Sequence, residues 1–410
     1  MYYSKIIRPI CYNAVMKIRS CVLLPTVLAS TLAAAESWTL KVVDLSGETN
    51  RHSVVAAGTP NFYNGHPTTI LMEDQRTMFC FWPVNHGGHG GPAARSDDAG
   101  RTWRRIDNLM PAGMRLFVEC PMAHRLVDPS GKERLWVWTG FKARNAAEAS
   151  GGVGSAERKA AALNDAAAMP SVMSEDGGNS WREMPPLGAK FRCILPFQGL
   201  VRLKDGSTLG VYHRGPVACV DEGSLEIVAS VTRNGGFTWS EPRVIAATDG
   251  LDLCEPWIGR SPDGCELVVL IRENTRKGAS KMIFSRDEGA TWTPPTDVPQ
   301  GLTGDRHQGT LLPDGRLVVC FRDVDKTSPT HGHYVAWIGP YAALHGDATD
   351  PGYRVKLFHS HAGWDCGYSG VHRLADGTIV CTTYVKYRDD DRRQSVMTTR
   401  FNPSETDARR

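Results

Sequence analysis

The sequence lacks a dominant charge of one sign. Its 410 residues carry 47 Lys and Arg against 44 Asp and Glu, and four of the basic residues lie in the first 35 positions, which hold no acid. The remaining 43 basic and 44 acidic residues nearly cancel. A balanced surface argues against nucleic acid as the main partner.

Metal-ligand motifs and long apolar runs are also missing. No Cys/His spacing resembles a zinc site, so neither a metal nor a cofactor is expected. After the N-terminal segment, no stretch is long and apolar enough to span a membrane.

The N-terminal segment resembles a secretory signal. From Met16 it has two basic residues, an apolar run and small residues before a plausible cleavage site near Ala35. We therefore expect residues 1–35 to be a leader, with translation starting at Met16, and residues 36–410 to form the mature domain, secreted or periplasmic. A single uncleaved N-terminal membrane anchor is the alternative.

Four segments share the pattern Ser/Thr, any residue, Asp/Asn, any residue, Gly, any residue, Thr/Ser, Trp. They are Ser96–Trp103, Ser174–Trp181, Thr232–Trp239 and Ser285–Trp292. The Asp or Asn can hydrogen-bond backbone amides two residues on, and the Gly supplies a positive φ. The Trp buries apolar area while its N–H can stay bonded. A turn that recurs between strand-like runs indicates a repeat architecture.

A second repeat consists of two apolar strands joined by a turn, usually Asp-Gly. Its copies are His66–Pro83, Pro121–Gly140, Gly199–Gly215, Trp257–Glu273, Gln308–Asp323 and Ser369–Val385. Asp-Gly between alternating apolar residues predicts a hairpin. Six hairpins with third strands predict an all-β, six-bladed β-propeller. We expect Trp38–Ser46 to supply the missing fourth strand of the sixth blade and close the ring.

One segment departs from the repeat. Lys142–Met169 is rich in Ala, Gly and charge and falls between the second and third strands of blade 2. It is interpreted either as a disordered surface loop or as a partly helical flap over the functional site.

Equivalent positions in the hairpins should ring one mouth of the central channel. Eight residues before each turn Asp lie His66, Cys120 (beside Glu119), Phe197, Glu255, Arg306 and Tyr368. The second strands end on the same face with Arg214, Arg272 and Arg322. Clustered guanidinium groups repel one another unless an anion lies among them, so this face is predicted to bind an anionic ligand.

These features together resemble the sialidase (neuraminidase) superfamily, whose propellers carry Asp-box turns. Cys254-Glu255-Pro256, followed by Asp263-Gly264 and Arg272, resembles the family segment with the catalytic Glu and the second substrate-binding Arg. Gly367-Tyr368-Ser369, before Asp376-Gly377 and Tyr384, resembles the segment with the nucleophilic Tyr. The resemblance implies Tyr368 as nucleophile, Glu255 as its base and Arg272 as a carboxylate ligand.

The chain departs from this family pattern at three places. Gly65-His66-Pro67 aligns with the family's Arg-Ile-Pro, and the loop Asn85–Gly91, where the acid/base Asp belongs, holds no carboxylate. The third arginine of the family has no clear counterpart in the third strand of blade 5, where His331 and His333 occur, and Arg306 or Arg322 could replace it. His86 or His89 could donate the proton, since imidazole titrates near neutral pH, or both could be solvated loop residues.

Three functions are therefore compatible with the sequence. The first is a secreted exo-glycosidase of the sialidase type acting on terminal acidic sugars. The second is a variant acting on another acidic glycan, as a uronate glycosidase or as a lyase by β-elimination. The third is a non-catalytic glycan-binding propeller.

Overall fold

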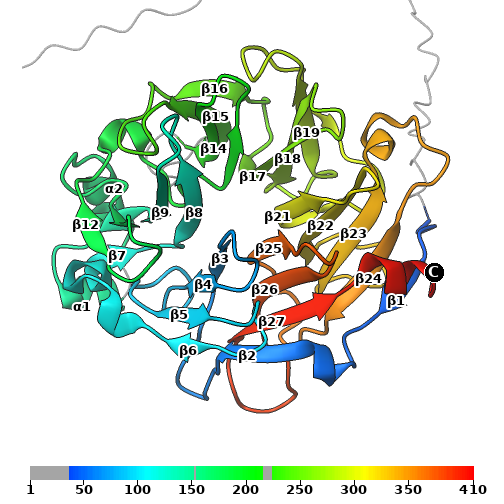
Figure 1. The fold of residues 1–410 in the computed structure, drawn as a ribbon, viewed down its shortest axis with the longest axis horizontal. Helices are drawn as coiled ribbons and strands as arrows, with labels where there is room; N and C mark the ends of the chain where they lie inside the picture. Colours follow the sequence, from blue (N-terminus) through cyan, green and yellow to red (C-terminus); the bar gives the residue numbers. More distant parts are fainter. Residues whose placement is uncertain (1–36, 152–153, 216–223) are drawn as a thin grey trace, which may run out of the picture. The chain divides into compact units, whose positions relative to one another are not determined.

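The computed structural model describes residues 37–151, 154–215 and 224–410, and the predicted leader at 1–35 lies outside them. Residues 37–410 form one unit built almost entirely of β-strands. Six sheets, antiparallel apart from one outer strand of blade 5, follow one another around a centre, which confirms the predicted six-bladed propeller (Figure 1).

Each blade is numbered by its order in the chain. Blade 1 contains β3 (Thr68–Leu71), β4 (Met78–Phe81), β5 (Ala93–Ser96) and β6 (Arg104–Arg105). Blade 2 contains β8 (Met122–Val127), β9 (Glu133–Trp138), β11 (Ser171–Ser174) and β12 (Arg182–Met184). Blade 3 contains β13 (Gly199–Arg202), β14 (Thr208–Arg214), β15 (Glu226–Thr232) and β16 (Arg243–Ala246).

The remaining blades follow the same order from centre to rim. Blade 4 contains β17 (Leu253–Arg260), β18 (Leu267–Glu273), β19 (Lys281–Ser285) and β20 (Thr296–Asp297). Blade 5 contains β21 (Gly304–Leu311), β22 (Arg316–Asp323), β23 (Tyr334–Pro340), β24 (Tyr353–Phe358) and β1 (Val42–Asp44). Blade 6 contains β25 (Ser369–Arg373), β26 (Ile379–Val385), β27 (Ser395–Phe401) and β2 (His52–Ala56).

The ring closes one strand later than the sequence predicts. The predicted closing segment Trp38–Ser46 forms β1, which pairs in parallel with β24 as a fifth strand of blade 5. Blade 6 is completed by β2, which pairs antiparallel with β27. The apolar Val43 and Leu45 explain the difference, because they pack into the hydrophobic cluster between blades 5 and 6 and hold β1 on the outer edge of blade 5.

Neighbouring blades are held together by buried apolar side chains. Each of the six joints has its own cluster, for example Trp136 and Trp138 of blade 2 with Tyr212 of blade 3. Burial of such large side chains supplies most of the stabilisation of the ring.

In all four Asp-box turns the Asp or Asn side chain accepts the amide four residues on. In the first, Asp98 Oδ1 accepts hydrogen bonds from the backbone N–H groups of Arg101 (3.0 Å) and Thr102 (2.8 Å). The carboxylate thus bonds amides three and four residues on, rather than two as predicted, because the Ser96 hydroxyl bonds Asp98 and the amide of Gly100. Gly100 has φ +81°, as predicted.

The segment Lys142–Met169 is partly helical where the structure describes it. It contains β10 (Phe141–Lys142, at its start), α1 (Ala146–Gly151) and α2 (Ser155–Ala162), and β10 pairs with β7 (Phe117–Val118). The remaining short elements are η1 (Thr49–Arg51), η2 (Asp107–Leu109), η3 (Ala112–Leu116), η4 (Ala189–Phe191), η5 (Tyr341–His345) and α3 (Pro403–Asp407). No helix within the described ranges has the length and apolarity needed to cross a membrane.

Candidate active site

A cavity of about 400 Å³ opens where the innermost strands begin. Its lining includes His66, Glu119, Cys120, Glu255 and Tyr368, which come from blades 1, 2, 4 and 6. The repeat register therefore brings residues that are up to 302 positions apart into one site. None of the Asp-box residues lines this cavity.

The backbone is strained where these inner strands start. Five residues there adopt left-handed φ values without being glycine: His66 (+47°), Glu119 (+79°), Phe197 (+39°), Glu255 (+51°) and Arg306 (+57°). In blades 4 and 5 the strand pairing also shifts register here, between Cys254 and Trp257 and between Asp305 and Gln308. Such bulges re-aim side chains and concentrate at functional sites.

Tyr368 and Glu255 form the centre of the site. The Tyr368 hydroxyl donates a hydrogen bond to Glu255 Oε1, and Arg272 Nη1 donates to the same oxygen at 2.8 Å. Arg272 Nη1 also lies 3.5 Å from the Tyr368 hydroxyl oxygen. Both Glu255 and Tyr368 are buried, at 3% and 7% exposure.

The surroundings set the protonation of this pair. Burial raises the pKa of Tyr368 well above its ordinary value, and the Glu255 charge adds to this, so the phenol is protonated in the resting site. Burial also raises the pKa of Glu255, but the Arg272 guanidinium and the hydrogen bond from Tyr368 outweigh it and leave that pKa below its ordinary value. The pair is therefore a neutral phenol bonded to a carboxylate that can take its proton.

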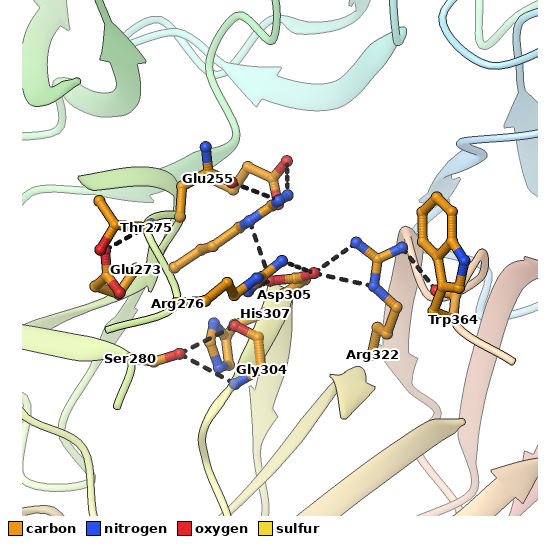
Figure 2. A network of polar contacts seen from close by, with 12 residues as sticks. Glu255, Glu273, Thr275, Arg276, Ser280, Gly304, Asp305, His307, Arg322 and Trp364 are labelled. Carbon is orange, nitrogen blue, oxygen red and sulfur yellow. Dashed lines mark hydrogen bonds and ion pairs between the residues drawn. The ribbon is translucent and has the colours of Figure 1, made fainter. Parts of the chain in front are cut away.

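Asp305 lies between three arginines, as Figure 2 shows for Arg276 and Arg322. Its carboxylate accepts from Arg276 at 2.5 and 2.7 Å and from Arg322 at 3.0 and 2.5 Å, and Arg272 Nε lies 3.0 Å from it. Asp305 is fully buried, and the charges of Arg272 and Arg322 hold its pKa below the ordinary range despite that burial. The anion that the clustered guanidinium groups require is thus supplied partly by the chain itself.

Arg306 has a different environment from Arg272 and Arg322. Its guanidinium is buried and donates only to the Gln198 carbonyl oxygen (3.4 Å) and to Met122 Sδ (2.9 Å). Within the described part of the chain, no carboxylate lies at ion-pair distance from it. It does lie within electrostatic reach of Glu255 and Tyr368, and burial lowers its pKa because its charge is poorly compensated.

His66 and His86 line the cavity near the phenol. The His66 ring is buried between His86, Tyr368 and Tyr384, with centroid separations of 4.3, 4.4 and 4.8 Å. Neither ring nitrogen of His66 has a hydrogen-bond partner among the described residues, and burial holds its pKa well below the ordinary value. His86 is more exposed, and its Nδ1 lies 3.5 Å from Asp365 Oδ1.

Of the nine predicted site residues, four line the cavity (His66, His86, Glu255 and Tyr368), whereas Arg214, Arg272, Arg306, Arg322 and His89 do not. The Nδ1 atom of His89 contacts the Gly90 carbonyl oxygen at 3.0 Å. Arg214 ends β14 but is paired with Glu226 of β15, its Nη2 lying 2.9 Å from Glu226 Oε1. Glu226 of the neighbouring strand therefore pairs with Arg214 outside the cavity.

Sequence reasoning passed over three acidic residues that matter here. Asp305 precedes Arg306, Asp365 accepts hydrogen bonds from the hydroxyl groups of Tyr63 and Tyr384 (both 2.9 Å), and Glu119 lines the cavity beside Cys120. Only Glu119 had a sequence signal, its position one residue before a register position. The contacts of the other two depend on residues from distant strands.

Comparisons with known proteins agree with this architecture. The family of BNR repeat-like domains matches residues 220–339, and no curated protein matches the sequence significantly. A protein of unknown function from Dyadobacter fermentans superposes with a TM-score of 0.61 at 17% identity, covering 85% of this chain and 98% of its own. The NanB sialidase from Streptococcus pneumoniae gives 0.55 at 14% identity, over 87% of this chain and 71% of that one.

A leech intramolecular trans-sialidase gives a TM-score of 0.52 at 12% identity, covering 92% of this chain and 72% of its own. The chain thus contains a BNR repeat-like domain at residues 220–339 and shares its fold with these solved structures. The BNR-repeat match contains Glu255, Arg272, Arg306 and Arg322, whereas Tyr368 lies after it. At 12–17% identity, these superpositions establish the propeller fold alone.

Proposed function

We propose that the protein is a retaining exo-glycosidase that removes terminal acidic sugars, as sialidases do. The hydrogen bond from Tyr368 to Glu255, with Arg272 on the same carboxylate oxygen, carries this proposal. A phenol that keeps its proton until attack suits an anomeric carbon bearing a carboxylate, because a carboxylate nucleophile would be repelled by it.

The residues perform the reaction in two displacements. The Tyr368 oxygen attacks the anomeric carbon while Glu255 takes the phenolic proton, and the leaving oxygen departs with the electron pair of its bond and takes a proton from a general acid. Water then attacks the same carbon and gives one proton to the conjugate base of that acid, while Tyr368 leaves and recovers its proton from Glu255. Two inversions give net retention.

Arg306 supports the choice of an acidic substrate. It is a buried guanidinium without an ion-pair partner among the described residues, and the charges of Glu255 and Tyr368 act on its pKa. A sugar carboxylate placed near Arg306 would gain charge-assisted hydrogen bonds from it. Arg272 and Arg322, by contrast, already contact Asp305.

Fluorogenic sialosides and uronides, assayed side by side, test this function. We expect release of the fluorophore from an α-sialoside and at least about a 10³-fold loss in Tyr368→Phe, since the nucleophile is removed. Tyr212→Phe is the matched control, because Tyr212 is a buried tyrosine of β14 outside the cavity. Binding of the sugar acid without turnover by the wild-type protein would instead favour a glycan-binding propeller.

The position of His66 favours one alternative reaction. Its ring, which has no hydrogen-bond partner among the described residues, packs against Tyr368, so the two could remove and deliver protons in β-elimination from a uronate. Elimination leaves an unsaturated sugar that absorbs in the ultraviolet, whereas hydrolysis does not. Appearance of that absorbance with a polyuronate substrate would assign the site to lyase chemistry.

The leader predicted at residues 1–35 adds a location to the proposal. We infer that the mature protein starts near Glu36 and acts outside the cytoplasm, where glycoconjugates are found. N-terminal sequencing of protein recovered from the culture medium or the periplasm tests this inference, and an intact Met16 there would contradict it.

A further inference from the structure

The loop Asn85–Gly91 contains no carboxylate, yet one lies against it. The backbone N–H of Glu119 donates to the Gly88 carbonyl oxygen at 3.3 Å. Glu119 Oε2 lies 2.6 Å from the point that a Cβ on Gly87 would occupy, and Gly87 has φ +66°. The absence of a Cβ at Gly87 therefore leaves room for the Glu119 side chain, which comes from blade 2.

Glu119 is placed to act within the cavity. It lines the same cavity as Tyr368 and Glu255, and only 5% of its surface is exposed. Burying an ionised carboxyl group costs free energy unless the group is paired or takes up a proton, so buried carboxyl groups in a cavity are candidates for a functional role.

The segment Lys142–Met169 supplies the partner of this carboxyl group. Arg158 of α2 forms an ion pair with Glu119 Oε1 and also lines the cavity. The titratable groups that face Glu119 are then Arg158 from α2, His86 from the loop and Cys120 from its own strand.

We propose that Glu119 is the general acid/base of this site and that Arg158 is the residue that positions it. This inference rests on the proposed glycosidase function. As the bond to the leaving group breaks, Glu119 gives its proton to the leaving oxygen and becomes a carboxylate. In the second displacement it takes a proton from the attacking water, which returns it to the starting state.

The protonation of Glu119 gives this role a pH signature. Burial raises its pKa to about 7, while the Arg158 and His86 charges lower it. A general acid must carry its proton, so kcat/KM should fall as the pH rises through about 7. Arg158→Met removes a charge that lowers this pKa, and the fall should therefore move to higher pH.

Leaving-group dependence provides the decisive experiment. Glu119→Gln should lower kcat/KM by about 10²–10⁴-fold for an unactivated sialyl disaccharide, but by less than about tenfold for a nitrophenyl sialoside, whose leaving group needs no proton. Azide should restore turnover of the nitrophenyl substrate in this variant, because it attacks the glycosyl-enzyme without base assistance. Glu157→Gln, at an exposed position of the same α2, is the control.

The outcomes separate the two proposals. A wild-type protein that cleaves no glycoside overturns the proposed function and this inference with it. If the wild type is active and Glu119→Gln is either unaffected or slowed equally on both substrates, only the role of Glu119 is overturned. Should Glu119→Gln fail to fold, an unchanged pH profile in Arg158→Met overturns it.

Discussion

At the scale of single residues, Arg306 and Arg322 show how the same side chain serves two purposes. Arg322 is bound by Asp305, and this carboxylate raises its pKa despite burial. Arg306 lacks such a partner in the described chain and meets only a carbonyl oxygen and a sulfur. Arg322 is therefore compensated within the chain, whereas the proposed function assigns Arg306 to an external anion.

This difference predicts the behaviour of Arg306→Met. Replacing a buried, uncompensated cation by an apolar side chain of similar length should leave the melting temperature unchanged or raise it. Affinity for a sugar acid should fall by about tenfold or more, because one charge-assisted hydrogen bond is lost. Calorimetric titration and thermal unfolding measure the two effects, and unchanged affinity would remove Arg306 from the site.

At the scale of elements, the Asp-box turn is a hydrogen-bonded connection outside the cavity. Asp176 accepts hydrogen bonds from the hydroxyl groups of Ser174 and Ser180 and from the amides of Asn179 and Ser180. These bonds lower its pKa to about 2. The turn holds its strand pair without contributing to the cavity.

Asp176→Ala should therefore lower the free energy of unfolding by about 1–3 kcal/mol, because several backbone and hydroxyl donors lose their acceptor. Asp176→Asn should cost less, since Asn234 fills the equivalent position in blade 3 and accepts the amide of Thr238 at 3.0 Å. Denaturant unfolding measures both changes. Equal losses for Ala and Asn would show that the side-chain acceptor is unimportant.

At the scale of the whole molecule, the ring is closed by two N-terminal strands with unequal roles. β2 pairs with β27 and completes blade 6, whereas β1 adds a fifth strand at the outer edge of blade 5. Removing β2 would expose the edge of β27 and unlink blade 6 from the start of the chain.

Truncation distinguishes these roles. A chain starting at Gly47 loses β1 and the apolar contacts of Val43 and Leu45, so it should fold with lower stability. A chain starting at Gly58 also loses β2 and should fail to form a monomeric propeller. Size-exclusion chromatography and circular dichroism compare the two, and a cooperative, monomeric second truncation would disprove closure by β2.

The repeats were predictable from the sequence because turn chemistry is local. The Gly of an Asp box and the Asp-Gly of a hairpin act on residues a few positions away, so their spacing predicts six blades. The same register placed Tyr368 and Glu255 at equivalent strand starts, and these residues, 113 positions apart, are in contact. Their chemical roles remain predictions.

The tertiary structure alone decided which charges meet. Asp305 forms ion pairs with Arg272, Arg276 and Arg322, and Glu119 of blade 2 lies against a loop of blade 1 and pairs with Arg158 of α2. An ion pair forms only when the two side chains point toward each other, and here bulges and left-handed residues set the side-chain directions. Local sequence patterns do not predict these contacts, because the contacts form only when the six sheets close around one axis.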